Sequence, residues 1–341
     1  MTSRRALLGA ALSPLLTGET KSWMRLSHAQ PCMGTMFRVV TFARDEEAGY
    51  RAIHKAFARA DELDAKLSDY KPESELSRLM QEGVAAPFQA SEDLFRVIEY
   101  AQRLARETDG LFDISIGPLS RLWRVCRDMH RLPDADELRE ARAKVGYRNI
   151  HLNRDTRGIQ LGIAGMQLDL GGIAKGYAAD AMRTVLAEAG IPASMVASGG
   201  DIALGTAPPA TRGWVVQLDP GDEFPGAKIP LSLHSRAVST SGAHRQSFTI
   251  EGKTYSHIVD PRTGLGLTRQ TAVSVIAPTA TETDALATAA SLMETGQAIA
   301  LLARRTGVSG RIFLSPSRKG AEAETRSTPG FTHYIAQPGS R

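Results

Sequence analysis

Two glycines and a lysine at the start of a predicted helix form the first candidate site. In the segment LDLGGIAKGYAAD (168–180), Gly171 and Gly172 precede a helical pattern, and Lys175 follows three residues later. Glycines at this position let backbone N–H groups approach an anion, and the helix dipole adds partial positive charge there. The segment matches neither a P-loop nor a dinucleotide-binding glycine pattern. It therefore indicates either an anion site or a tight strand-to-helix turn with a solvated lysine.

An acid and an alcohol four residues apart form the second candidate site. Asp284 and Thr288 lie in TETDALATAASLM (281–293), which is expected to be a helix capped by Thr281. Residues at i and i+4 share one face of a helix. A carboxylate and a hydroxyl are hard oxygen ligands, so the pair suits Mg²⁺ when waters and substrate phosphates complete the shell. The alternative is an Asp favoured by the helix dipole and a Thr that bonds to its own turn.

A third candidate site lies in the segment HIVDPRTG (257–264). Its Asp-Pro and Thr-Gly pairs are strong turn signals, but a turn alone requires neither a histidine nor an arginine. His257 titrates near neutral pH and could move a proton. Arg262 could hold a phosphate or fix the carboxylate of Asp260. A β-turn with a surface histidine is the alternative interpretation.

Two further turns and a missing nucleophile narrow the chemistry. The small-residue segments SGGDI (198–202) and STSG (239–242) would let a flat ligand or a phosphate contact the backbone. The chain has no nucleophile-elbow sequence, and no two carboxylates have a sequence spacing that indicates an acid–base pair. Together, these features predict that the protein binds and activates a phosphorylated cofactor.

Hydrophobic patterns predict the elements that position these residues. The segment CMGTMFRVVTFA reads as one strand from Cys32, and a helix from about Glu46 keeps its apolar residues on one face. This helix breaks at Pro72, and a new one starts at a Ser74 cap. A second amphipathic helix ends at Gly110, where a residue that tolerates positive φ is favoured.

The rest of the chain continues to mix helices and strands. Residues 111–123 are expected to form a short extended piece and a Gly-Pro turn, and a charged helix follows Pro133. The segment NIHLNRDTRGIQLG alternates around a turn, which predicts a hairpin. Another helix follows Gly172 and ends at Gly190, and further strands are expected in WVVQLDP, KIPLSLHSRAVSTSG, SFTIEGKTYSHIVDP and TAVSVIAP. Because the elements lack a regular βαβ rhythm, the pattern favours an α+β fold over a doubly wound sheet.

Composition and charge exclude several classes of protein. The chain has 341 residues, a formal net charge of +4 and two cysteines. Its basic residues are scattered without a dense run, so nucleic-acid binding is not expected. Cys32 and Cys126 lie far apart and fit no Cys-x-x-Cys pattern, which disfavours a structural zinc site. Beyond the N-terminus, no segment has the apolar length of a membrane helix.

The N-terminal segment resembles an export signal. Arg4 and Arg5 precede an apolar run of the length of a signal h-region, as in twin-arginine signals. No clear small-x-small cleavage site follows. Residues 1–27 are therefore interpreted as an export leader or a disordered N-terminus. A periplasmic location, or one on the exported face of the inner membrane, is expected, with a cytoplasmic location as the alternative.

A series of motifs in order resembles one protein family. The motifs are MGT, SDYKPESELSRL, DGLFDISIGPL, LDLGGIAKGYAAD, SGGDIALG, STSG, HIVDPRTG and TDALATAASLM. They are similar to those of the FAD:protein FMN transferase family, ApbE. The resemblance implies a single α+β catalytic unit over residues 28–335, followed by a tail at 336–341. This unit is expected to combine mixed sheets with packed helices and to allow two subdomains around a flavin cleft.

The resemblance also implies a reaction and its site. Family members bind FAD and Mg²⁺, move the FMN half onto a Ser or Thr hydroxyl of another protein, and release AMP. The implied magnesium ligands are the backbone carbonyl of Gly172 and the side chains of Asp284 and Thr288. The implied catalytic residues are His257, as candidate base, with Asp260 and Lys175. The implied cofactor-binding residues are Met33, Tyr70, Leu111, Phe112, Asp113, Asp169, Lys175 and Ile258.

Two alternatives to transfer stay open. A hydrolase with the same metal site would split FAD into FMN and AMP with water as acceptor, and a non-catalytic FAD-binding module would release no AMP. The retained Asp284 and Thr288 favour the two catalytic interpretations. The chain departs from the family pattern at Met80, Ala197 and Ala243, which could reshape the pocket. The expected partner is an acceptor protein with a Ser or Thr site, either a membrane-bound redox subunit or a soluble reductase.

Overall fold

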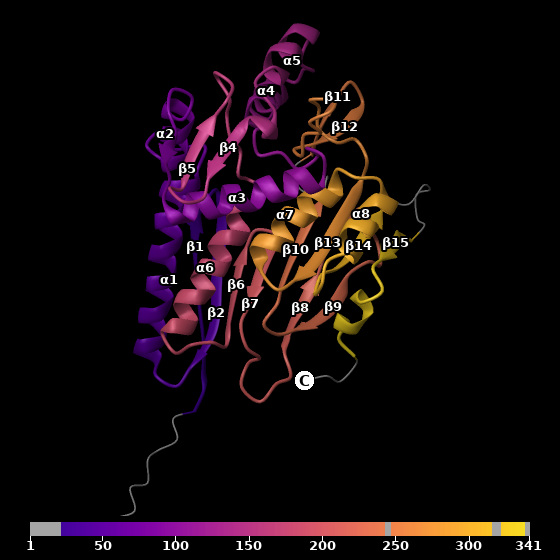
Figure 1. Ribbon diagram of the computed structural model, residues 1–341. Helices are drawn as coiled ribbons and strands as arrows, with labels where there is room; N and C mark the ends of the chain where they lie inside the picture. The colour runs from indigo at the N-terminus through magenta and orange to yellow at the C-terminus, as the bar shows by residue number, and fades with distance from the viewer. Residues whose placement is uncertain (1–21, 243–246, 316–321, 338–341) are drawn as a thin grey trace, which may run out of the picture.

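The computed structural model describes residues 22–242, 247–315 and 322–337 (Figure 1). The expected leader (1–27) lies outside these ranges except for its last residues, as do Ala243 and most of the expected tail (336–341). Within the described ranges, no helix is both long enough and apolar enough to cross a membrane. The leader and the domain boundaries stay predictions.

An eight-stranded sheet forms the centre of the molecule (Figure 1). Its strand order is β1-β2-β6-β7-β10-β13-β14-β15, and every neighbouring pair is antiparallel. Of the described strands, the first in sequence, β1, lies at one edge of the sheet, and the last, β15, lies at the other edge. The strands are β1 (Met24–Cys32), β2 (Thr35–Ala43), β6 (Ser194–Ser198), β7 (Asp201–Leu204), β10 (Ala237–Gly242), β13 (Thr271–Ala277), β14 (Ser309–Leu314) and β15 (Glu324–Ser327).

The middle of this sheet is buried on both faces. Successive side chains of a strand point to opposite faces. In β13, Val273 and Val275 belong to one core cluster, whereas Ala272 and Ile276 belong to another. All seven residues of β13 are buried. Burial on both faces explains why this segment is an almost continuous apolar run rather than an alternating one.

Four helices cover one face of the sheet (Figure 1). Helix α1 packs on the strands at the β1 edge, followed by α6, α7 and α8 toward the other edge. In α1, the Asp45 side chain caps the helix by accepting from the Ala48 N–H, and Ile53, Phe57 and Leu63 share the buried face. The bounds are α1 (Glu46–Leu67), α6 (Ala174–Glu188), α7 (Ala280–Ser291) and α8 (Thr295–Ala303).

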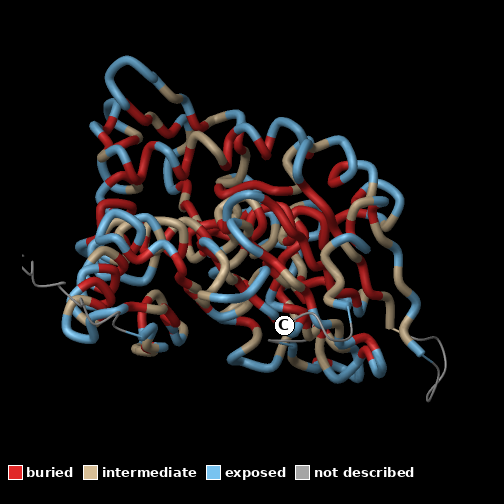
Figure 2. Tube along the Cα trace, turned by 90° about the horizontal axis from the view of Figure 1, so that it is seen from below, coloured by how far each residue is buried: buried red, intermediate tan, exposed pale blue. Residues whose placement is uncertain are grey.

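The opposite face is covered by a hairpin and a C-terminal turn. Strands β8 (Trp214–Leu218) and β9 (Ile229–Leu233) and the 3-10 turn η2 (Phe331–Tyr334) contribute to the second core cluster. Phe313 of the large sheet lies in the same cluster. Figure 2 shows buried residues in red running through the interior, while exposed residues in pale blue lie on the outer turns.

Smaller elements lie beyond one end of the large sheet (Figure 1). A three-stranded sheet of order β3-β5-β4 accompanies two helices, and two further helices pack with a hairpin around Trp123. The bounds are α2 (Glu75–Glu82), β3 (Phe88–Gln89), α3 (Glu92–Glu107), α4 (Gly117–Asp128), α5 (Ala135–Arg142), η1 (Tyr147–Asn149), β4 (Ile150–Asn153), β5 (Gly158–Leu161), β11 (Ser247–Ile250) and β12 (Lys253–Ser256).

The α+β class expected from the sequence is confirmed, and two expected elements are wrong. The single strand expected from Cys32 is two strands, because Met33 and Gly34 form a turn between β1 and β2. Residues 111–123 do not end in a Gly-Pro turn, because α4 begins at Gly117. A proline fits the first turn of a helix, where its missing N–H needs no partner.

The expected helix boundaries are mostly confirmed. Ser74 caps α2 by accepting from the Ser77 N–H, and Gly110 follows α3 with a φ of +78°. The cap of α7 was expected at Thr281 and is Thr279, whose side chain accepts from the Glu282 N–H. Thr279 has an extended backbone, as a cap requires, whereas residue 281 is already inside the helix.

Candidate active site

A cavity of about 900 Å³ lies where turns at one end of the large sheet meet α4, α7 and the β11–β12 hairpin. Ligand sites commonly have volumes of about 300–1,000 Å³, so this cavity suits a ligand as large as a dinucleotide. Of the expected site residues, Asp260 does not line the cavity. Those that line it are Met33, Tyr70, Leu111, Phe112, Asp113, Asp169, Gly172, Lys175, His257, Ile258, Asp284 and Thr288.

The β1–β2 turn brings Met33 to the cavity. Two-residue hairpin turns that match the twist of their strands need positive φ at both central positions. Met33 has a φ of +48° and Gly34 a φ of +72°. The neighbouring Cys32 is buried, and burial raises the pKa of its thiol to about 12. The cysteine beside the cavity is therefore a packed thiol and not a reactive thiolate.

The loop after α3 forms an apolar wall of the cavity. Phe112 is buried, and its N–H donates to the hydroxyl of Thr108 at 3.1 Å. Asp113 anchors the loop, since its carboxylate accepts from the Ser115 N–H at 2.8 Å and from the Tyr147 N–H at 2.9 Å. Burial raises the pKa of Asp113, and these hydrogen bonds offset only part of that rise. The Asp113 side chain thus holds the wall in shape.

The glycine turn before α6 presents both backbone and charge to the cavity. Asp169 accepts from the Gly171 N–H at 2.8 Å, and the Lys175 Nζ donates to the Gly171 carbonyl at 2.7 Å. The same Nζ lies 3.6 Å from Asp284 and 3.8 Å from Asp201. Burial alone would lower the pKa of Lys175, but the charges of these two aspartates more than offset it and raise the pKa. Lys175 is therefore a fixed cation at neutral pH.

The Gly172 backbone, Asp284 and Thr288 meet in one place. A Cβ at Gly172 would lie 3.2 Å from the Thr288 hydroxyl oxygen, so the glycine allows this close approach. Asp284 is buried and accepts from the Gly176 N–H at 3.1 Å. In a regular helix that N–H would bond the Gly172 carbonyl. Among the described residues, no hydrogen bond ends on this carbonyl, which leaves it open toward a ligand.

These three oxygens fit a hard divalent cation. A backbone carbonyl, a carboxylate and a hydroxyl are donors that Mg²⁺ accepts, with waters or phosphate oxygens completing the shell. Within the described part of the chain, no three His, Cys, Asp or Glu side chains gather as a metal cluster. Because the set contains a single carboxylate, waters or ligand oxygens would have to complete the shell of a bound cation.

The HIVDPRTG segment is a turn that faces the cavity on one side only. His257 is exposed and lines the cavity. Asp260 is buried and accepts from the Arg262 Nη2 at 2.7 Å and from the Arg262 N–H at 2.8 Å. Its carbonyl accepts from the Gly264 N–H at 2.7 Å. Asp260 thus stabilises its own turn, and its catalytic role stays a prediction.

Six charged residues that line the cavity are not among the residues predicted from the sequence: Asp64, Asp69, Lys71, Arg124, Arg127 and Asp201. Asp201, the first residue of β7, is buried and lies 3.8 Å from the Lys175 Nζ. Its motif was recognised as a turn, but the acid within it was not. Arg124 lines the cavity from α4, directly after the segment 111–123 that the sequence predicts as a short extended piece and a Gly-Pro turn. Of the departures from the family pattern, Met80 and Ala197 do not line the cavity.

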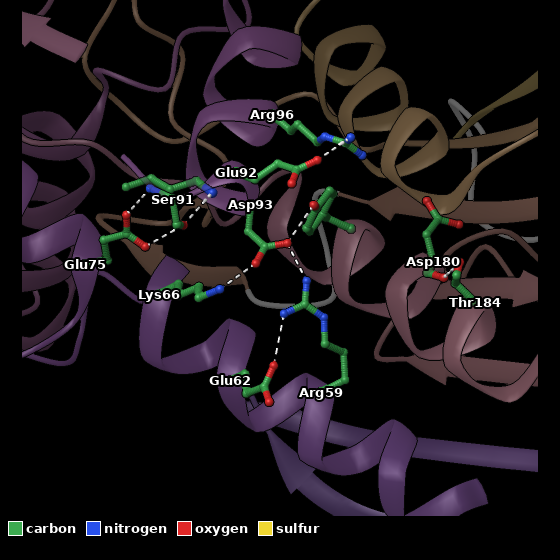
Figure 3. A network of polar contacts seen from close by, with 12 residues as sticks. Arg59, Glu62, Lys66, Glu75, Ser91, Glu92, Asp93, Arg96, Asp180 and Thr184 are labelled. Carbon is green, nitrogen blue, oxygen red and sulfur yellow. Dashed lines mark hydrogen bonds and ion pairs between the residues drawn. The ribbon is translucent and has the colours of Figure 1, made fainter. Parts of the chain in front are cut away.

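A partly buried network of ion pairs and hydrogen bonds links helices α1, α3 and α6 (Figure 3). Asp93 of α3 accepts from Arg59 and from Lys66 of α1, the latter at 2.6 Å, and from the Tyr177 hydroxyl of α6 at 2.9 Å. Burial alone would raise the pKa of Asp93, but these hydrogen bonds lower it below its ordinary value. Through Tyr177, which lies two residues after Lys175, the network connects α6 to α1 and α3.

The antiparallel sheet, its helical layer and the large charged cavity define an α+β protein whose cavity has room for a ligand of dinucleotide size. Comparison with known proteins then gives the family. The ApbE family model matches residues 33–312, and the chain belongs to this family. It is an enzyme of the transferase class.

Curated relatives carry one name. The FAD:protein FMN transferase of Treponema pallidum is 32% identical over 309 residues, covering 86% of this chain and 85% of the relative. The protein of the same name from Escherichia coli K12 is 27% identical and covers 89% of this chain and 87% of its own.

Solved structures share the fold. The ApbE protein of Thermotoga maritima superposes with a TM-score of 0.79 at 26% identity, covering 93% of this chain and all of the other. The flavin transferase ApbE of Vibrio cholerae superposes with the same TM-score at 24% identity.

Proposed function

We propose that this protein transfers the FMN part of FAD to a Ser or Thr hydroxyl of an acceptor protein and releases AMP. The observation that carries the proposal is the meeting of Lys175, Asp284, Thr288 and the open Gly172 carbonyl in one cavity of dinucleotide size. Its relatives, which cover most of the chain, are named for this reaction.

The flavin would use the apolar part of the cavity. Met33, Phe112 and Ile258 are apolar, and the exposed ring of Tyr70 lines the same cavity. Flat aromatic ligands gain stability by stacking on rings and by burying apolar area. The pyrophosphate would then reach the glycine turn, where the Lys175 ammonium favours negative charge.

Mg²⁺ would be held by the Gly172 carbonyl, Asp284 and Thr288. When bound there, it supplies charge neutralisation for the pyrophosphate and for the leaving AMP. The two aspartates beside Lys175 keep that residue protonated, so it adds a second positive charge at the same end of the cavity. This arrangement stabilises the negative charge that develops in phosphoryl transfer.

At the reacting phosphorus, the transfer step forms one P–O bond and breaks another. The acceptor oxygen attacks the phosphorus on the FMN side, the bond from that phosphorus to the AMP oxygen breaks, and AMP leaves. The hydroxyl proton passes to an imidazole nitrogen of His257, the candidate base, which lines the cavity and is exposed to an incoming protein. Asp284 is the alternative base.

The partner and compartment follow as parts of the same proposal. The acceptor would be a redox subunit or a reductase with a Ser or Thr flavinylation site. The twin arginines Arg4 and Arg5 support an exported protein, with the acceptor facing the periplasm.

One assay separates transfer from hydrolysis. The purified protein is incubated with FAD, Mg²⁺ and a candidate acceptor, and flavin fluorescence of the acceptor band is recorded in a denaturing gel. Transfer predicts a fluorescent band that a chelator abolishes. Release of AMP and free FMN without labelling would identify a pyrophosphatase, and FAD binding without AMP would identify a non-catalytic binding protein.

A further inference from the structure

Arg124 of α4 joins three walls of the cavity. Its Nη2 donates to the Asp69 carboxylate at 3.1 Å and lies 3.6 Å from the Asp169 carboxylate. Its guanidinium carbon lies 4.8 Å from the centre of the Tyr70 ring. One side chain therefore connects the loop after α1, helix α4 and the glycine turn before α6.

Tyr70 needs such a partner. Its ring is 75% exposed although it lines the cavity, so packing against the protein does little to fix its orientation. A guanidinium over one face of the ring contributes a cation–π attraction and leaves the other face available for stacking. The orientation of the Tyr70 ring therefore depends on where Arg124 is held.

Arg124 is itself held firmly. Its Nε donates to the Ser120 carbonyl one turn earlier in α4 at 3.3 Å, and Asp69 accepts from the other end of the guanidinium. Asp69 and Asp169 together offset its positive charge. The Nε and Nη2 donors of Arg124 are thus directed at protein acceptors, Ser120 and Asp69. The planar face of the guanidinium lies over the Tyr70 ring.

We propose that Arg124 is a positioning residue for flavin binding, which orients the Tyr70 ring so that the flat ring system of the flavin can stack on it. This inference rests on the proposed function. It assigns a role to a residue outside every motif that carries the family resemblance. Arg124 acts through Tyr70 and is not expected to touch the reacting phosphates.

The test is a double-mutant cycle on FAD binding. The Kd for FAD is measured by fluorescence anisotropy, and the KM for FAD and kcat by acceptor labelling. The variants are Arg124→Ala, Arg124→Lys, Tyr70→Ala and the double alanine variant. Arg121→Ala is the matched control, because Arg121 is exposed on the same helix and does not line the cavity. Thermal unfolding of each variant checks the fold.

The expected result is a rise in Kd and KM for FAD of about 3- to 10-fold in Arg124→Ala, with kcat within about twofold of the wild type. Arg124→Lys retains the positive charge but lacks the planar guanidinium. Its Kd and KM for FAD should therefore lie between those of the wild type and those of Arg124→Ala. In the Tyr70→Ala background, Arg124→Ala should add no further change, because the two residues act as one unit.

Several outcomes would overturn the inference. An unchanged Kd in Arg124→Ala, or equal effects with and without Tyr70, would mean that Arg124 does not act through the ring. A fall in Tm with an unchanged Kd would make its role structural only, and a wild-type protein that binds no FAD would remove the basis of the idea. If the wild type binds FAD but labels no acceptor, the proposed function fails, while the Kd values still decide the role of Arg124.

Discussion

Replacing Gly176 by alanine should force helices α6 and α7 apart. A Cβ at this position would lie 2.2 Å from the Ala280 carbonyl oxygen and 2.9 Å from the Asp284 Cβ. Backbone atoms cannot rotate away, so the helices must move. Overpacking at its upper range costs about 3 kcal/mol, and the helix propensity of alanine returns about 1 kcal/mol. The net loss of about 2 kcal/mol lowers the Tm of a chain of this size by about 3 °C.

The same substitution should impair transfer more than it impairs folding. Gly176 donates its N–H to Asp284 at 3.1 Å, so a displaced α7 carries this carboxylate away from the Gly172 carbonyl. A misplacement of about 1 Å can cost about 100-fold in rate. With a net stability of about 5–15 kcal/mol, the variant stays folded at 25 °C, and the lost rate therefore reports the geometry of the site.

Calorimetry and acceptor labelling measure the two effects separately. Gly296→Ala is the matched control, because Gly296 lies in helix α8 and a Cβ there would meet nothing within 4 Å. Its Tm should stay equal or rise slightly, and its labelling rate should not change. The reasoning would be refuted if Gly176→Ala kept the Tm and the labelling rate of the wild type.

Three other changes test further parts of the protein. Asp284→Ala should abolish Mg²⁺-dependent labelling of the acceptor, measured by in-gel fluorescence; labelling at the wild-type rate would remove the metal assignment. His257→Ala should slow transfer about 10²- to 10⁴-fold at pH 7 with an unchanged Kd for FAD, and full transfer would give the role of base to another group. Asp93→Asn should remove an acid-sensitive part of the stability. Hydrogen bonds hold the pKa of Asp93 below its ordinary value, so the wild type keeps this contribution above about pH 4 and loses it as the pH falls further. Denaturant unfolding at a series of pH values from 7 to 3 gives the free energy of unfolding of both proteins. The same dependence of this free energy on pH in the wild type and in Asp93→Asn would contradict the prediction.

Local signals in the sequence predicted much of the candidate site. The glycine pair at Gly171 and Gly172 marks a turn before a helix, and the four-residue spacing of Asp284 and Thr288 places both on one helical face. Each signal depends only on neighbouring residues, so periodicity and turn chemistry were enough to find it. The family resemblance then grouped these separate signals into one site.

Features that depend on tertiary contacts could not be predicted in this way. Met33 adopts positive φ although a methionine has no preference for it, and strand-forming residues on both sides hide the turn. A Gly-Pro pair is common both in turns and at the start of helices, so Gly117 and Pro118 do not reveal that α4 begins there. The sequence therefore does not show that Arg124 lies on a helix beside the cavity. Asp201 becomes notable only when the fold brings Lys175 to within 3.8 Å.

The cavity wall is drawn from nearly the whole chain, from the β1–β2 turn to helix α7. Such a pocket depends on contacts between residues that are far apart in sequence, and these form late because loop closure must precede them. A nascent or truncated chain that lacks α7 would have the glycine turn but neither Asp284 nor Thr288 opposite it. Ligand binding at this cavity is therefore expected to require a chain that is folded at least through α7.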